Sequence, residues 1–285
     1  MSPRRALLLC GVFAPPLFFL ALLLFGWMTP GYDLARQFIS ELGAVDSPVR
    51  VLVNVFGFGL FGVFLVLFSV GVVRSSVLRT TGKLSALFFF AAVVSMILVG
   101  VFSCDANCIN TTVTGDLHNK FSFYPFPILT VAFLLLLVDA TRIKNLRWLV
   151  PFIPLLGIPA LIFRFASLPL LREMYPGLLQ RAAIGLPFFL VMLIAMGVYR
   201  TEEPGDARIP KSAKFFYTTA LALIVLSVAG LMFSLFASSR APYDGVPGIC
   251  ADTTECRTIC QNNRGRCQSY CARNEEAPVC TVLGF

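Results

Sequence analysis

Seven apolar segments decide what this chain can fold into. Each is long enough to cross a lipid bilayer, which takes about 20 residues in an α-helix. They lie at residues 6–29, 50–73, 84–103, 122–140, 148–167, 183–199 and 215–238. Hydrophobic residues make up 57% of the chain and charged residues 13%, whereas a soluble domain has about 25% charged residues. Because backbone groups cannot stay unpaired in lipid, the sequence predicts an all-α, polytopic integral membrane protein with seven transmembrane helices.

The basic residues between these segments predict the orientation. Twelve lie at the N-terminus and in every second loop: Arg4, Arg5, Arg74, Arg79, Lys83, Arg142, Lys144, Arg147, Arg200, Arg208, Lys211 and Lys214. The opposite short loops contain only Arg36, Arg50, Lys120, Arg172 and Arg181. By the positive-inside rule the N-terminus is cytoplasmic, and seven spans then place the C-terminus outside. The net charge of +8 is mostly this orientation signal. We expect no nucleic acid partner, because no basic run is interleaved with exposed aromatic residues.

The nine cysteines predict the same topology independently. Cys10 lies within the first apolar segment, and no cysteine falls in a predicted cytoplasmic loop. Cys104 and Cys108 lie in an outer loop, and the other six lie in the segment that follows the seventh span. Because disulfides persist in oxidising compartments, we expect these eight cysteines to be paired outside the cytoplasm. We place the protein in the cell membrane.

The C-terminal segment is rich in cysteine and small. It carries two C-x3-C pairs, in which cysteines four residues apart share one helix face. Two short antiparallel helices would then form a hairpin. Its two helices would be joined by the disulfides Cys256–Cys271 and Cys260–Cys267, and Cys250–Cys280 would join the two ends of the hairpin. Six cysteines allow many connectivities, so this pairing is a geometric preference, and the spacing fits a zinc site poorly. We divide the chain into a seven-helix transmembrane bundle at 1–238 and an extracytoplasmic cysteine-rich tail at 239–285, which offers a surface to a protein partner.

Most of the polar residues of the bundle are predicted to lie at its outer end. The loop at 103–120 contains the only histidine, His118, with Asp105 and Asp116. We take these three as candidate catalytic residues, because a carboxylate that orients the ring would make His118 a general base. The candidate ligand-binding residues are Ser40, Glu41, Asn54, Asn119 and Arg164.

Arg164 is the one charge clearly inside a predicted span. A buried arginine in lipid finds a partner or a water-filled cavity. One interpretation is a structural ion pair with Glu41, Asp105 or Asp116, and the other is a small polar pocket that opens outward. The preceding outer loop has Leu34, Phe38, Ile39 and Leu42 at helical spacing, which predicts a short helix lying along the outer surface.

The single histidine limits the metal and cofactor chemistry that this chain can support. A zinc site would need carboxylates for its other ligands, and paired axial histidines for a haem cannot be assembled from one. We therefore expect no metal and no cofactor.

Several short motifs resemble a known family in order and spacing. They are Ile39-Ser40-Glu41-Leu42-Gly43-Ala44, then Asn54 with Gly57-Phe58, then Gly100-Val101-Phe102-Ser103-Cys104-Asp105, then Gly115-x-Leu117-His118-Asn119. This pattern is similar to the uncharacterised multi-pass proteins grouped as a domain of unknown function (DUF998), and it covers roughly residues 30–200. That family typically has a proline between the phenylalanine and the cysteine, where this chain has Ser103. The resemblance implies a polytopic helical bundle and implies no activity.

The sequence favours a non-enzymatic membrane protein whose outer polar pocket and tail bind a lipid headgroup, a small ligand or a partner protein. One alternative is a membrane-embedded enzyme that modifies lipids, with His118 as base and Arg164 holding an anionic headgroup. A transporter is a weaker alternative, because it predicts acidic or polar residues at mid-membrane, and apart from Arg164 the sequence has almost none there. Membrane lipids are the expected partners in each case.

Overall fold

The computed structural model describes residues 2–108, 112–165 and 175–202 as a bundle of helices, without strands in those ranges. The seventh apolar segment at 215–238 and the tail at 239–285 lie outside the described residues. Within the described ranges, six helical segments are long and apolar enough to cross a membrane: Pro3–Trp27, Arg50–Val73, Thr80–Val101, Val113–Arg142, Lys144–Ile162 and Pro176–Thr201. They coincide with the first six predicted spans.

Several of these spans are divided into shorter elements. The first is the uninterrupted helix α1 (Pro3–Trp27). The second runs through α2 (Arg50–Leu52), the π-helical turn η2 (Val53–Gly59) and α3 (Leu60–Val73). The third is α4 (Thr80–Val101), and the fourth joins α5 (Val113–Phe123) to α6 (Pro125–Arg142). The fifth comprises the 3-10 turn η4 (Lys144–Leu149) and α7 (Phe152–Phe165), and the sixth is α9 (Pro176–Thr201).

The helices pack in a closed circuit. Along it, α1 packs against α3, α3 against α4, and α4 against α6, while α7 packs against α9 and α9 returns to α1. Aromatic rings join three of these helices near the middle, where Phe18 of α1 lies 4.5 Å from Phe61 of α3 and 5.6 Å from Phe188 of α9, measured between ring centroids. The packing of α6 against α7 is the sparsest between neighbours in this circuit. The circuit is therefore least tightly closed between α6 and α7.

One end of the bundle, which we call the basic end, comprises the start of α1, the connections at 74–79 and 143–149, and Glu202. Arg5 stacks 4.2 Å from the ring centroid of Tyr199. At the loop 74–79, the Glu202 carboxylate accepts hydrogen bonds from the hydroxyls of Ser75 and Ser76. The buried carboxylate of Asp139 accepts hydrogen bonds from the backbone N–H of Arg79 and from the hydroxyl of Thr81. The described parts of the regions that the sequence assigns to the cytoplasm therefore meet at one end.

The opposite end, which we call the loop end, is formed by residues 28–49, 102–108, 112–118 and 175–181. Its first loop contains the 3-10 turn η1 (Ile39–Gly43), in which Ile39 and Leu42 are fully buried. The sequence predicted a helix along the outer surface here, whereas this short turn inserts its apolar side chains into the top of the bundle. The burial of those side chains explains the apolar spacing that suggested a surface helix.

Candidate functional site

Hydrogen bonds from a buried arginine join the first loop to the start of α9. The guanidinium of Arg181 donates hydrogen bonds to the backbone oxygens of Gln37 (2.9 Å) and Gly177 (3.0 Å) and to the hydroxyl of Tyr32 (2.6 Å). That hydroxyl in turn donates to the Phe38 carbonyl at 2.9 Å. Burial raises the pKa of Tyr32 to about 12, although the positive charge of Arg181 opposes the rise. The phenol therefore stays protonated at physiological pH and holds both partners in place.

Two acidic side chains shape this first loop from within. The Glu41 carboxylate accepts hydrogen bonds from the Phe38 backbone N–H and from the Gln37 side-chain amide, both at 2.9 Å. Asp33 accepts from the backbone N–H of Ala35 at 2.8 Å. Glu41 and Asp33 are both buried, and their oxygens satisfy backbone donors that would otherwise be unpaired. Glu41, predicted as a ligand-binding residue, is thus part of the loop framework.

The second loop is tied to the first by small polar groups and a disulfide. The Asn54 amide donates to the Gly43 carbonyl (3.0 Å) and to the Ser103 hydroxyl (2.9 Å). Cys104 and Cys108 form a disulfide. The Val45 N–H donates to the Cys104 carbonyl at 3.0 Å. Asn54, predicted as a ligand-binding residue, joins η2 to both loops.

Asp105 organises the start of α5. Its carboxylate accepts hydrogen bonds from the backbone N–H of Thr112 (2.7 Å) and from the Thr112 hydroxyl (2.6 Å). That hydroxyl also accepts from the backbone N–H of Gly115 and so caps the helix. The sequence predicted a loop over 103–120, but this cap begins a helix at Val113 and places His118 on it. Asp116 forms an ion pair with Lys120 at 2.6 Å, with both side chains about half exposed.

His118 is the most unusual group at the loop end. It is 5% exposed, and its Nδ1 lies 2.7 Å from the Phe102 carbonyl oxygen and 3.1 Å from that of Val99. Because carbonyl oxygens only accept hydrogen bonds, Nδ1 must carry the hydrogen. Nε2 is then the nitrogen with the free lone pair. It is buried and has no hydrogen-bond partner among the described residues.

A cavity of ≈ 50 Å³ lies beside this histidine. Its polar lining residues are Ser40, His118, Ser122 and Gln180, and the remaining lining is apolar. Ser122 donates its hydroxyl hydrogen to the Asn119 carbonyl (2.9 Å), and the Gln180 side-chain oxygen accepts from the Ile39 N–H (2.6 Å). The cavity thus brings together two predicted site residues, Ser40 of the first loop and His118 of α5.

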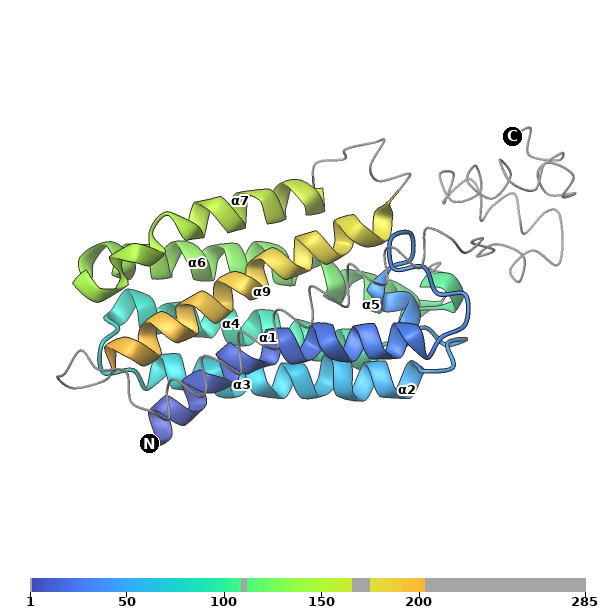
Figure 1. The fold of residues 1–285 in the computed structure, drawn as a ribbon, viewed down its shortest axis with the longest axis horizontal. Coiled ribbons are helices and arrows are strands. Elements are labelled where there is room, and N and C mark those ends of the chain that lie inside the picture. Colours follow the sequence, from blue (N-terminus) through green and yellow to red (C-terminus); the bar gives the residue numbers. More distant parts are fainter. Residues whose placement is uncertain (1, 109–111, 166–174, 203–285) are drawn as a thin grey trace, which may run out of the picture.

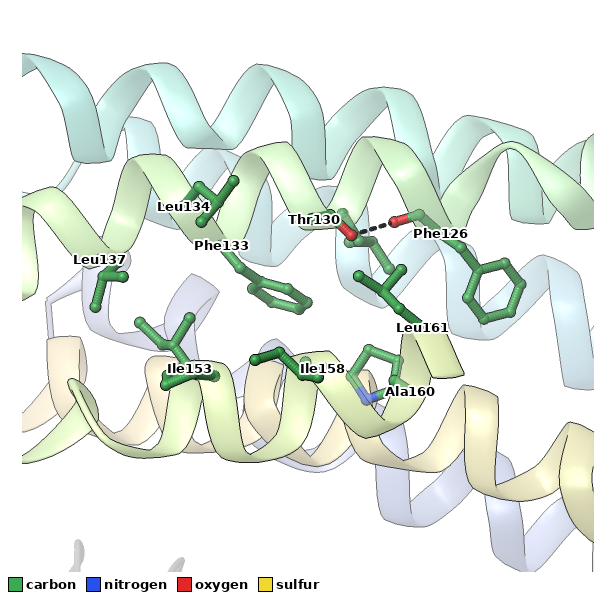
Figure 2. A pocket seen from close by; sticks show the side chains of 13 residues that line it. Phe126, Thr130, Phe133, Leu134, Leu137, Ile153, Ile158, Ala160 and Leu161 are labelled. Atoms are coloured by element: carbon green, nitrogen blue, oxygen red, sulfur yellow. Dashed lines mark hydrogen bonds between the residues drawn. The ribbon is translucent and has the colours of Figure 1, made fainter. Parts of the chain in front are cut away.

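An apolar cleft of ≈ 140 Å³ adjoins this cavity between α6 and α7. Figure 2 shows Phe133 and Leu137 of α6 facing Ile153 and Ile158 of α7 across it. Among the described residues that line it, Thr130 is the one polar side chain, and it donates its hydroxyl hydrogen to the Phe126 carbonyl of its own helix at 2.9 Å. The cleft and the cavity share three lining residues: Phe126, Leu129 and Pro187.

The remaining predicted site residues are not gathered at the cavity. Asn119 is exposed beyond it. Arg164 lies on α7, but its side chain is outside the described residues, as are the six tail cysteines. Its three proposed partners, Glu41, Asp105 and Asp116, each bind the other groups given above. Neither Asp105 nor Asp116 is hydrogen-bonded to Nδ1 of His118, which is oriented by backbone carbonyls instead.

Sequence reasoning missed three residues of this end: Ser103, Gln180 and Arg181. Arg181 was counted only as a basic loop residue, because it lies just before the predicted sixth span. The run Gly177-x-x-Gln180-Arg181 in the first turns of an apolar helix was the available signal, since polar groups there must find partners.

One cluster at the loop end has metal-ligating residue types. A ring nitrogen of His118 and the sulfur atoms of Cys104 and Cys108 lie within 4.8 Å of one another. The sulfurs are joined in a disulfide, and it is the thiolate form of cysteine that binds metal ions. In this state the cluster offers a metal a single nitrogen ligand.

Comparison with known proteins places the bundle in one group. A family model described as "Protein of unknown function (DUF998)" matches residues 12–197. That range runs from the first helix to nearly the end of α9 and includes the loop end. No curated protein and no solved structure gives a significant match.

Proposed function

The chain belongs to the DUF998 family of proteins of unknown function, and we propose that it binds an amphipathic membrane molecule at the loop end of its helical bundle. The molecule's polar group occupies the cavity beside His118. Its apolar chain lies in the cleft between α6 and α7. The proposal fits a membrane-type helical protein whose expected partners are lipids.

The unpartnered Nε2 of His118 carries this proposal. A buried polar atom without a partner costs about 1–3 kcal/mol relative to one that is hydrogen-bonded, and native proteins contain few of them. Nδ1 already binds two carbonyl oxygens, so Nε2 is the nitrogen left for a ligand. His118 lines the cavity, so a ligand group that enters it and displaces the atoms covering Nε2 would satisfy this nitrogen.

The adjoining cleft supports an amphipathic ligand over a small polar one. It lies where the helix circuit is least tightly closed, and its described lining offers hydrocarbon contacts and no free donor. A ligand with an alkyl chain could reach the cavity sideways from the bilayer, past Phe126 and Leu129. Binding pockets of this kind are mostly apolar with a few placed polar groups.

Binding is favoured over catalysis by the surroundings of His118. A general base must lie within hydrogen-bond reach of the proton it removes, and among the described residues no hydroxyl or thiol is hydrogen-bonded to Nε2. The hydrogen of Nδ1 is held by the carbonyl oxygens of Val99 and Phe102 and not by a carboxylate that would strengthen the ring as a base. A protein partner for the tail and a role for Arg164 stay predictions.

A substitution that fills the cleft tests the proposal. A β-carbon at Gly157 of α7 would meet no atom within 4 Å, and Gly157 lines the cleft. Gly157→Leu should therefore occupy the cleft without disturbing the fold. The probe is a 16-carbon alcohol with a diazirine in its chain, added to the full-length protein in nanodiscs, with labelled peptides located by mass spectrometry.

We expect the probe to label α6 and α7 in the unsubstituted protein, and Gly157→Leu to reduce that labelling at least fivefold. The matched control is Leu155→Phe, which adds bulk at an exposed position of the same helix outside the cleft. It should leave the labelling unchanged. Labelling spread evenly over all lipid-facing helices, or equal in the two variants, would refute binding in the cleft.

A further inference from the structure

We infer that the ligand presents an uncharged hydroxyl group to His118, so that the class of molecule bound is a lipid alcohol. This inference rests on the proposed function and specifies it. The sequence alone predicted a lipid headgroup as one possible ligand but did not predict its charge. Arg164 was the residue expected to bind an anionic headgroup. The chemistry of the described cavity selects against an anion.

The first argument is the direction of the hydrogen bond that Nε2 can make. Because Nδ1 faces the carbonyl oxygens of Val99 and Phe102, it holds the hydrogen of the neutral ring, and Nε2 can only accept. A carboxylate or a phosphodiester has acceptor oxygens and no donor for it. A hydroxyl group has a donor.

Protonating Nε2 would reverse that direction but would place a positive charge on a ring that is 5% exposed. The imidazolium would face a cavity whose described lining includes no carboxylate. The carboxylate of Asp105, on the neighbouring loop, is engaged by Thr112. A buried charge without a partner is far more costly than a neutral acceptor.

The second argument is that the described lining includes no lysine or arginine. Arg181 follows the lining residue Gln180 in the chain, but its guanidinium binds Tyr32, Gln37 and Gly177. An anionic headgroup would thus lose its hydration without gaining a cation. The serine hydroxyl of Ser122, which donates to Asn119, keeps lone pairs that suit a donor in the ligand.

The third argument is size. One water molecule needs about 10–15 Å³ of such space, so a cavity of ≈ 50 Å³ takes a group of only a few non-hydrogen atoms. The hydroxyl end of an alkyl chain fits this description, whereas a phosphoglycerol headgroup is much larger. The chain itself continues past Phe126, Leu129 and Pro187 into the cleft.

The test is a competition experiment with the full-length protein in nanodiscs. The diazirine-bearing 16-carbon alcohol is the label, and the unlabelled competitors are hexadecanol, its methyl ether, hexadecanoate and hexadecyl phosphate. The methyl ether keeps the oxygen and the chain but cannot donate a hydrogen bond. We expect hexadecanol to compete best, the methyl ether to be about tenfold weaker, and both anions to be weaker than hexadecanol.

His118→Asn is the diagnostic variant. Its amide NH₂ can replace Nδ1–H as the donor to the carbonyl oxygens of Val99 and Phe102, while the acceptor at Nε2 is lost. We expect hexadecanol and its methyl ether to compete equally in this variant. An unchanged melting temperature shows that the loop end is intact, and Asn119→Ala, at the exposed neighbouring position, should keep the preference for the alcohol.

The outcomes separate this inference from the proposed function. If Gly157→Leu reduces labelling but all four competitors are equivalent, the cleft binds an alkyl chain and the hydroxyl inference is wrong. A preference for the anions would also overturn it. If no competitor displaces the probe and Gly157→Leu has no effect, the cavity holds only water and both proposals fail.

Discussion

Gly177 shows how closely single residues fit at the loop end. It lies in the first turn of α9, and a β-carbon there would lie 2.3 Å from the Gln37 carbonyl oxygen and 2.6 Å from that of Leu34. These are backbone atoms, so the loop would have to move away and strain the Arg181 hydrogen bonds. We predict that Gly177→Ala lowers the free energy of unfolding by about 1–3 kcal/mol, measured as a lower melting temperature in detergent.

Gly185, two turns further along α9, provides the control. A β-carbon there would meet the Phe19 ring at 3.4 Å, an ordinary van der Waals distance. Gly185→Ala should be neutral or should stabilise the protein by up to about 1 kcal/mol, because alanine favours the helix. Equal destabilisation by both alanine substitutions would show that helix flexibility, and not the contact with the loop, explains the effect.

At this scale the sequence identifies the unusual residue but not its chemistry. His118 stands out as the only histidine beside apolar segments. Which of its nitrogens carries the hydrogen depends on where α4 ends, because the carbonyls of Val99 and Phe102 are its partners. The partner of Arg181 could not be identified from the sequence, because Tyr32 lies 149 residues away in the chain. Such partners become visible only in the folded molecule.

At the scale of elements, the apolar cores of the spans could be predicted and their ends could not. The segment 113–123 contains too few apolar residues to be recognised as helix, and its start depends on the Thr112 cap held by Asp105. The first loop was predicted as a surface helix, because the same apolar spacing that favours such a helix also arises when Ile39 and Leu42 insert into the bundle. The spacing of apolar residues shows that they are buried on one side, but it does not show whether they pack against lipid or against other helices.

The contact between α9 and the loop 74–79 gives a prediction about pH. Burial alone would raise the pKa of Glu202, but hydrogen bonds from Ser75, Ser76 and Val77 lower it below the ordinary glutamate value. A lowered pKa in the folded state means that the contact stabilises the protein at neutral pH. This contribution decreases as the pH falls below the ordinary value, about 4.3, and is lost below the lowered one.

Glu202→Gln should therefore reduce stability by about 1 kcal/mol at pH 7, because the contact is partly exposed. The difference in melting temperature between the variant and the unsubstituted protein should shrink as the pH falls from 5 to about 3. Asp46→Asn, which removes an exposed carboxylate at the opposite end, serves as the control and should show no such trend. A difference that stays constant with pH would mean that the charge of Glu202 does not contribute.

At the scale of the whole molecule, the number of apolar segments does not determine how they are arranged. The sequence gives no sign that α1 contacts α9, or that α6 and α7 pack sparsely, because lipid-facing and helix-facing positions are both apolar here. The cleft arises from that arrangement, so it could not be predicted. The position of the basic connections at one end could be predicted, because basic residues occur in every second loop and successive spans place those loops on the same side.

The predicted orientation is tested by introducing exposed cysteines at the two ends. Asp46 lies at the loop end and Asn145 at the basic end, and both are exposed. In intact cells, a membrane-impermeant maleimide should label Asp46→Cys above the background of the unsubstituted chain and should label Asn145→Cys only after permeabilisation. An epitope tag placed after Phe285 should then be accessible from outside, because the predicted seventh span would return the chain to that side. A tag that is accessible only from the cytoplasm would mean an even number of spans, and the reversed pattern of maleimide labelling would overturn the predicted orientation.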